Sequence, residues 1–140
     1  MTPVAPRAYA FHRSFPKLDR EWHEFPHHYL LYASSGTFIL EVGTVEWVMP
    51  PQRAAWIEAL TPISVSAAGP VTSDSVLFEP DFIVLPPGPC RVFSTSTLAI
   101  EMVRYTVRWG PDRTRDDTAA DRFFLALANV CSELAQTPRC

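Results

Sequence analysis

The chain has 140 residues, of which 47% are apolar and 19% charged, with a net charge of −3. These values predict one soluble globular domain and argue against a nucleic-acid-binding surface over the whole chain, although a local basic patch remains open. No apolar stretch approaches the roughly 20 residues that span a bilayer, and the N-terminus does not resemble a signal peptide. The three cysteines are odd in number and lack metal-ligand spacing, which is typical of a reduced, cytoplasmic protein.

The first two-thirds of the chain is rich in proline and in short β-type runs. Fourteen prolines stand against five glycines, and each proline tends to end a strand. Nine short strands are predicted, over residues 9–15, 29–33, 37–42, 45–49, 54–57, 63–67, 75–78, 82–85 and 91–94. We expect residues 37–49 to form a hairpin and residues 17–24 a connection. This spacing indicates an antiparallel barrel or sandwich.

The pattern becomes helical after residue 95. A first helix is predicted over 96–108, with Leu98, Met102, Tyr105 and Trp109 on one stripe, ended by Gly110-Pro111. A second helix is predicted over 118–136, capped by Asp117 or Thr118 and ended by Thr137-Pro138. We therefore expect a β barrel with an N-terminal arm over 1–95 and a two-helix extension of the same domain over 96–140.

The second helix carries a broad apolar face. Phe124, Leu127, Cys131 and Leu134 recur at spacings of 3, 4 and 3. This face either packs back on the barrel or forms part of a dimer interface, since amphipathicity alone does not separate the two. We interpret these four residues as candidate dimerisation residues.

Few residues suggest catalysis. The histidines His12, His23, His27 and His28, with Glu24 nearby, are the one plausible metal set, and they form an incomplete motif. The serines lack a Gly-x-Ser-x-Gly frame. Arg91 could lower the pKa of its neighbour Cys90, although a cysteine at the start of a short apolar strand is more often buried. No catalytic residue, metal or cofactor is predicted.

A pocket inside the barrel is the remaining candidate site, because small barrels can hold one small molecule. The candidates for its wall are the aromatic residues Trp22, Phe25, Tyr29, Tyr32, Phe38, Trp47, Trp56, Phe78 and Phe82. The candidates for orienting a ligand are His23, Glu41, Glu46, Arg53 and Glu58. Which of these face the cavity depends on strand register, which the sequence alone leaves open.

Two segments together carry a family resemblance. Residues 23–36 (HEFPHHYLLYASSG) and 47–65 (WVMPPQRAAWIEALTPISV) resemble the N-terminal cupin-type sensor domain of AraC-type transcriptional regulators. The family frame has a His-x-His, a Gln-Leu-x-Tyr-Ala run, a Gly turn, Trp-x-x-Pro-Pro-x-Arg-Ala-x-Trp-Ile-Pro, and a later His. Residues 89–92 and 94–98 match the strand that leads into the family's first helix, so the resemblance covers about residues 20–135.

The chain departs from this frame at four positions. Phe25 and Ile63 stand where the family has histidines, Tyr29 stands where it has glutamine, and Glu58 stands where it has proline. Of the cupin metal triad only His23 is in place. The departures disfavour a metal-dependent enzyme and indicate a more apolar pocket.

The resemblance implies a cupin-like double-stranded β-helix, or jelly-roll barrel, followed by two α-helices. It implies a non-enzymatic, cytoplasmic sensor that binds a small-molecule effector and forms a homodimer, with no membrane partner. DNA would be bound only through a C-terminal domain that this sequence lacks, which favours the sensor half of a longer regulator. The expected ligand-binding residues are His23, Phe25, Tyr29, Trp47, Arg53 and Trp56. The alternatives are a small metal-dependent cupin enzyme and a stand-alone binding protein.

Overall fold

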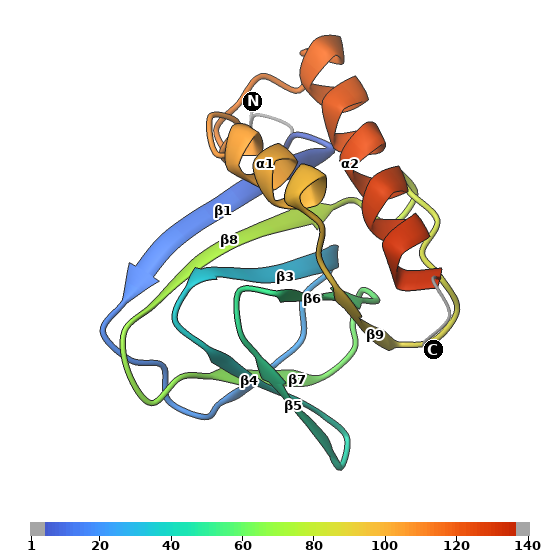
Figure 1. Cartoon of the computed structure of the whole chain (residues 1–140). Coiled ribbons are helices and arrows are strands. Elements are labelled where there is room, and N and C mark those ends of the chain that lie inside the picture. Colours follow the sequence, from blue (N-terminus) through green and yellow to red (C-terminus); the bar gives the residue numbers. More distant parts are fainter. Residues whose placement is uncertain (1–4, 137–140) are drawn as a thin grey trace.

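A computed structural model describes residues 5–136, which form nine strands followed by two helices (Figure 1). Predictions that concern residues 1–4 and 137–140, including Cys140 and the Thr137-Pro138 helix stop, lie outside the described residues. The strands are β1 (Ala8–Phe15), β2 (Trp22–His23), β3 (His28–Ser35), β4 (Phe38–Val42), β5 (Val45–Met49), β6 (Arg53–Ile57), β7 (Ile63–Ser66), β8 (Val71–Phe78) and β9 (Cys90–Ser94). The helices are α1 (Thr97–Thr106) and α2 (Thr118–Gln136).

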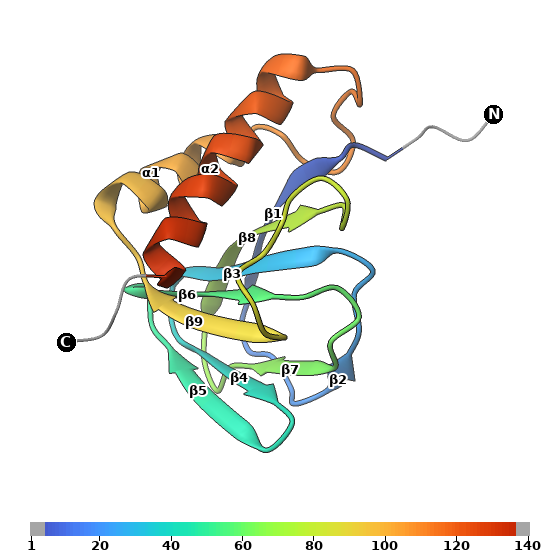
Figure 2. The ribbon, with the colours of Figure 1, turned by 90° about the vertical axis from the view of Figure 1, so that its right-hand side faces the viewer.

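The strands form two antiparallel sheets that face each other. The order is β1-β8-β3-β6-β9 in the five-stranded sheet and β2-β7-β4-β5 in the four-stranded sheet. Both helices cover the outer face of the five-stranded sheet, and the four-stranded sheet lies on its other side (Figures 1 and 2). The expected cupin-like fold, a mainly β architecture with two C-terminal helices, is confirmed.

Each strand of the five-stranded sheet contributes side chains to two cores, because successive side chains alternate between the two faces of the sheet. On β6, Ala54 and Trp56 belong to a core shared with the helices, whereas Ala55 and Ile57 belong to a core between the sheets. All four side chains are at most 2% exposed. Residues 54–57 therefore do not alternate between apolar and polar side chains, as expected of a strand that is covered on both faces.

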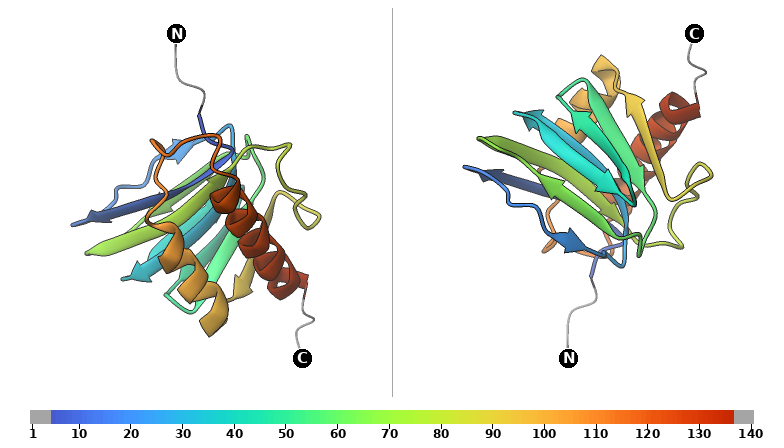
Figure 3. Two further views of the ribbon diagram at one scale, coloured as in Figure 1. Left: turned by 90° about the horizontal axis from the view of Figure 1, so that it is seen from above. Right: turned by 90° about the horizontal axis from the view of Figure 1, so that it is seen from below.

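The second helix packs on its own sheet, as one of the two interpretations of its apolar face expected. The Asp117 carboxylate accepts a hydrogen bond from the Ala120 amide at 3.0 Å and caps the helix. Phe124, Leu127 and Cys131 are at most 2% exposed. With the partly buried Leu134, they belong to the core between sheet and helices. Seen from above, α2 lies across the strands (Figure 3), so these four residues face the protomer's own sheet.

Three other details differ from prediction. Residues 82–85 form no strand, because Pro80, Pro86, Pro87 and Pro89 around them cannot donate to a ladder. The two-residue strand β2 lies within the predicted connection over residues 17–24, and it is too short to show a pattern. In α1 the buried residues are Ala99, Val103 and Thr106. Leu98 and Tyr105 of the predicted stripe are 59% and 43% exposed.

No helix within residues 5–136 is long and apolar enough to cross a membrane.

Candidate ligand-binding cavity

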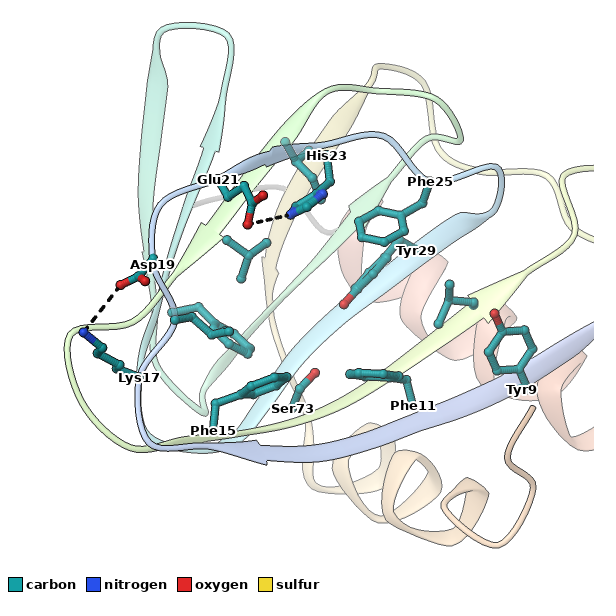
Figure 4. Close-up of a pocket in the computed structure, with 15 residues that line it drawn as sticks. Tyr9, Phe11, Phe15, Lys17, Asp19, Glu21, His23, Phe25, Tyr29 and Ser73 are labelled. Atoms are coloured by element: carbon teal, nitrogen blue, oxygen red, sulfur yellow. Dashed lines mark ion pairs between the residues drawn. The ribbon is translucent and has the colours of Figure 1, made fainter. Parts of the chain in front are cut away.

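A cavity of about 590 Å³ lies between the two sheets (Figure 4). Its volume falls within the roughly 300–1,000 Å³ of small-molecule sites. Six aromatic and four aliphatic residues make most of its wall: Tyr9, Phe11, Phe15, Phe25, Tyr29, Phe38, Leu18, Ile63, Val65 and Leu77. The polar lining consists of Lys17, Asp19, Glu21, His23 and Ser73. An apolar wall with few polar groups favours a largely apolar ligand.

The edge strand β1 contributes three aromatic residues to one side of the cavity. Its odd positions Tyr9, Phe11 and Phe15 line the cavity, while the even position Ala8 is buried against the helices. The neighbouring strand β8 pairs with β1 in antiparallel register, with Tyr9 opposite Leu77. Leu77 and Ser73 therefore point to the same side as the β1 rings.

A cluster of hydroxyl groups lies on the sheet wall of the cavity. The Ser73 and Ser75 hydroxyls are 2.8 Å apart, and both lie near enough to the Tyr29 hydroxyl to lower its pKa. The Tyr32 amide also donates to the Ser75 hydroxyl at 3.3 Å. Burial raises the pKa of Tyr29, and the two serine hydroxyls only partly offset this effect. Tyr29 is therefore a neutral phenol at physiological pH.

The charged side chains lie at the mouth of the cavity. Lys17 Nζ lies 3.8 Å from Asp19 Oδ1, and His23 Nε2 lies 3.6 Å from Glu21 Oε2 (Figure 4). All four side chains are at least half exposed. The mouth thus carries two carboxylates against one permanently charged ammonium.

The segment between β1 and β2 that carries this mouth is held at two points. Leu18 and Ala67 exchange two backbone hydrogen bonds of 3.0 Å. Arg20 makes a bidentate ion pair with Glu41 of β4, at 2.7 and 3.0 Å. The hydrogen bonds from Arg20 lower the pKa of Glu41. The mouth is therefore a fixed loop rather than a free end.

Three of the six predicted ligand-binding residues reach the cavity. His23, Phe25 and Tyr29 line it, with the Phe25 and Tyr29 ring centroids 5.2 Å apart. Ile63, another departure from the family frame, lines it as well.

The other three predicted ligand-binding residues lie elsewhere. Trp56 faces the helix layer and contacts Phe78 at 5.5 Å between ring centroids. Arg53 is exposed at the start of β6. Trp47, on β5 at the sheet edge, packs on the inter-sheet core but does not line the cavity. The structure therefore places these three residues outside the cavity, contrary to the prediction. The sequence alone did not show which face of its strand each side chain occupies.

The histidines are dispersed over the molecule. His12 Nδ1 contacts the Asp74 carboxylate across β1 and β8, His27 packs edge-on against Tyr9, and His28 Nδ1 accepts a 3.0 Å hydrogen bond from the Ala59 amide. Within residues 5–136, no three His, Cys, Asp or Glu side chains lie close enough together to hold a metal ion.

The idea that Arg91 activates Cys90 is wrong. Arg91 Nε donates instead to the Ala135 carbonyl of α2, at 2.6 Å. Burial raises the pKa of Cys90 to about 11.

Several cavity residues were not predicted. The alternation of residues 9–15 predicted the strand that carries Tyr9, Phe11 and Phe15. It did not show that this strand borders the cavity. Ser73 was missed because β8 begins at Val71, four residues before the predicted strand.

The strand β1 also connects the cavity to the helix layer. The Ala10 amide donates to the Trp109 carbonyl at 2.8 Å, and Arg113 Nε donates to the Ala8 carbonyl at 2.7 Å. Both partners lie in the segment between α1 and α2. A shift of β1 therefore reaches the helices through one backbone–backbone hydrogen bond and one hydrogen bond from the Arg113 side chain.

Comparisons with known proteins identify the class of fold. No protein-family model matches the chain, and no curated protein matches it by sequence. Among solved structures, the chain shares its fold with part of an AraC-family regulator, which confirms the resemblance seen in the sequence at the level of the fold alone.

The particular structures are those of ToxT from Vibrio cholerae. A 1.65 Å structure superposes with a TM-score of 0.62 at 10% identity, over 94% of this chain and 58% of ToxT. ToxT bound to (E)-4-(8-methylnaphthalen-1-yl)but-3-enoic acid gives a TM-score of 0.64 at 10% identity, over 94% and 59%. ToxT bound to an unsaturated fatty acid gives 0.63 at 10% identity, over 98% and 58%. The chain thus spans less than three-fifths of the ToxT chains it matches.

Proposed function

We propose that this chain is the effector-sensing domain of an AraC-type transcriptional regulator and that it binds a small, largely apolar molecule between its two sheets. The observation that carries the proposal is the aromatic-lined cavity of about 590 Å³ inside a fold shared with ToxT. In this proposal the domain is a cytoplasmic sensor rather than an enzyme.

Two of the ToxT structures support this kind of ligand. Their bound molecules, an unsaturated fatty acid and a naphthalenyl butenoic acid, both combine a large apolar body with one polar end. The cavity of the present chain has the same division, since its wall is apolar and its few polar groups lie at the mouth and around Tyr29.

The proposed mechanism is a population shift carried by β1. A ligand that contacts Phe11 and Phe15 would favour one position of this strand. Because Ala8 and Ala10 hydrogen-bond to the segment between α1 and α2, that position would also favour one arrangement of the helices. Two binding events coupled in this way meet the thermodynamic definition of allostery.

Regulation would require a homodimer and a DNA-binding domain outside this sequence. We place the dimer contact on the outer stripe of α1, where Leu98 and Tyr105 are 59% and 43% exposed. Paired DNA-binding domains would then meet two half-sites at a spacing set by the dimer.

Ligand binding to a variant with a narrowed cavity tests the proposal. Val65 lines the cavity, so Val65→Trp should narrow it. Val48 on β5 is 54% exposed, so Val48→Trp is the matched control. We expect oleate, added as monomer, to raise the Tm of the wild type and of Val48→Trp by several degrees, because a bound ligand stabilises by mass action. Val65→Trp should show a smaller rise than the wild type.

Calorimetry under the same conditions provides the binding constants. Equal oleate affinity in the wild type and in Val65→Trp would place the ligand outside the cavity and overturn the proposal.

A further inference from the structure

The cavity extends along β1, and its two ends differ in character. Tyr9 lies at the opposite end from Lys17 and Asp19 of the charged mouth, and Phe15 lies toward the mouth (Figure 4). Tyr9 and Phe15 are six positions apart on β1, which corresponds to about 20 Å of strand, whereas facing sheets pack only about 10 Å apart. The cavity therefore has a long axis, and Tyr9 lies at its inner end.

Three neighbouring strands contribute a side chain at the level of this inner end. Leu77 of β8 lies opposite Tyr9 of β1 on one side and opposite Tyr29 of β3 on the other. All three residues line the cavity. Tyr9 is the second residue of β1 and Leu77 is the last but one of β8. This row thus lies where the two strands end.

The apolar lining stops at this row. Two positions beyond Tyr9 and Leu77, the chain carries Arg7 and Glu79, which form an ion pair of 3.2 Å between Nε and Oε2. Neither of these two residues lines the cavity. The His27 ring packs edge-on against Tyr9, with the ring centroids 5.8 Å apart. An apolar group that extended past Tyr9 would leave apolar surroundings, and it would gain no further hydrophobic stabilisation there.

The backbone on both sides of Tyr9 is fixed. The Ala8 carbonyl accepts a 2.7 Å hydrogen bond from Arg113 Nε, and the Ala10 amide donates a 2.8 Å hydrogen bond to the Trp109 carbonyl. The other edge of the strand pairs with β8. Moving this part of β1 aside for a longer ligand would break at least one of these contacts. Tyr9 is therefore a fixed stop.

We propose that Tyr9 is the residue that determines ligand length in this cavity, and that the effector is an elongated, largely apolar molecule whose inner end stops at the Tyr9 ring. This inference rests on the proposed function, since it concerns the ligand of the same cavity. It concerns the apolar end of the ligand and holds for any polar group at the other end.

Two series of straight-chain probes test the inference on the purified chain. They are n-alkanoates and n-alkanols of about six to fourteen carbons, kept below their solubility limits and titrated by calorimetry. Each additional buried CH₂ strengthens binding about fourfold. The affinity of the wild type should therefore rise with chain length until the chain reaches Tyr9, and then stop rising. We call the longest chain that still gains affinity the length limit, and we expect it to agree within one carbon between the series.

Three substitutions of Tyr9 connect this limit to its ring. Tyr9→Val removes the ring but keeps a residue that favours strands, so the limit should move to longer chains. The first chain beyond the wild-type limit should then bind about fourfold more tightly to Tyr9→Val than to the wild type, or better. Tyr9→Trp enlarges the ring and should move the limit to shorter chains. Tyr9→Phe keeps the ring and is the matched control, with the wild-type limit.

A second control lies on the side of the cavity. Phe11→Leu removes part of the β1 wall and should change the affinities without moving the length limit. Because Tyr9→Val and Tyr9→Trp are expected to act in opposite directions, a general loss of stability cannot produce both shifts. If one of them fails to fold, seen as the loss of its unfolding transition without ligand, the other decides.

The outcomes separate the inference from the proposed function. A wild-type affinity that keeps rising to the longest chain, a limit that is unchanged in the folded Tyr9→Val and Tyr9→Trp variants, or an equal shift in Phe11→Leu would overturn the inference. If oleate or these chains bind and Val65→Trp weakens them, the sensor function stands even when the Tyr9 inference fails. If neither oleate nor any chain of either series binds, both fail.

Discussion

The guanidinium of Arg113 and the carboxylate of Asp121 lie 2.7 Å apart, between Nη2 and Oδ1, in a position where the arginine side chain is only 4% exposed. The same guanidinium donates to the Ala8 carbonyl at 2.7 Å and packs 5.2 Å from the centroid of the Phe124 ring. One side chain thus connects the first strand, the loop before α2 and the first turn of α2.

Removing one partner of this pair should destabilise the domain strongly. Asp121→Asn leaves a buried guanidinium without its counter-charge, and breaking a buried pair costs about 3 kcal/mol or more. We expect a clear fall in the urea midpoint with an unchanged slope. The control is Glu101→Gln, which breaks the surface pair with Arg104, where both side chains are more than half exposed. It should change the free energy of unfolding by less than about 0.5 kcal/mol. Similar midpoints for the two variants would mean that Asp121 does not hold Arg113.

Substitution of two helix leucines should separate folding from dimerisation. Leu127 is fully buried in α2 and Leu98 is 59% exposed on α1. Leu127→Asp buries a charge in the core and should cost more than about 4 kcal/mol, so that most of the chain no longer folds. Leu98→Asp should keep a cooperative unfolding transition and shift the protein from dimer to monomer in analytical ultracentrifugation. A dimer that persists in Leu98→Asp would show that the α1 stripe is not the contact.

Acid should weaken the loop contact made by His28. Burial lowers the pKa of His28, although nearby Glu58 and the Pro80 carbonyl act in the opposite direction. A lowered folded-state pKa means that the unfolded chain takes up the proton first. The contribution of His28 to stability is therefore present above the usual histidine pKa of about 6.5 and is lost as the pH falls below it.

The variant His28→Asn checks this pH dependence. Its Oδ1 can still accept from the Ala59 amide, as His28 Nδ1 does, but it does not titrate. The free energy of unfolding between pH 7 and 5 should fall less in His28→Asn than in the wild type. His23→Asn at the exposed mouth is the matched control and should follow the wild-type curve. Parallel curves for all three proteins would rule out a role for His28 in acid sensitivity.

The two described cysteines should be unreactive in the folded state. Burial raises the pKa of Cys90 to about 11 and that of Cys131 to about 12, so almost no thiolate exists at pH 8. In a Cys140→Ser variant, Ellman's reagent should label neither cysteine within minutes at pH 8 and should label both in 6 M guanidinium chloride. Rapid labelling of one native thiol would show that the strand or helix around it opens readily.

Much of the fold was predictable because proline and apolar alternation mark most strand ends. The hairpin over residues 37–49 and the limits of α2 agree closely with the structure. The strand predicted over residues 82–85 was wrong, because its apolar residues Phe82, Ile83 and Leu85 pack on the helix-side core without pairing with another strand. Apolar burial and strand formation give the same sequence signal over so short a run.

The site was less predictable than the fold because it depends on which way each strand turns. Phe25, Tyr29 and Ile63 could be found from their departures from a family frame, and all three line the cavity. Trp56 could not be assigned to the inter-sheet core or to the helix-side core from the sequence, since both faces of β6 are buried and a tryptophan fits either core. Sheet pairing, which is a long-range property, decides such cases.

The alternation along β1 has a consequence for how such a domain can change over generations. Deleting one residue within β1 would send Tyr9 and Phe11 toward the helices and bring small alanines to the ligand side, since the strand repeat is two residues. Point substitutions at the odd positions alter only the ring surface offered to a ligand. We therefore expect ligand preference to diverge through exchanges at these odd positions, whereas the length of this strand is kept constant by the helices on its other face.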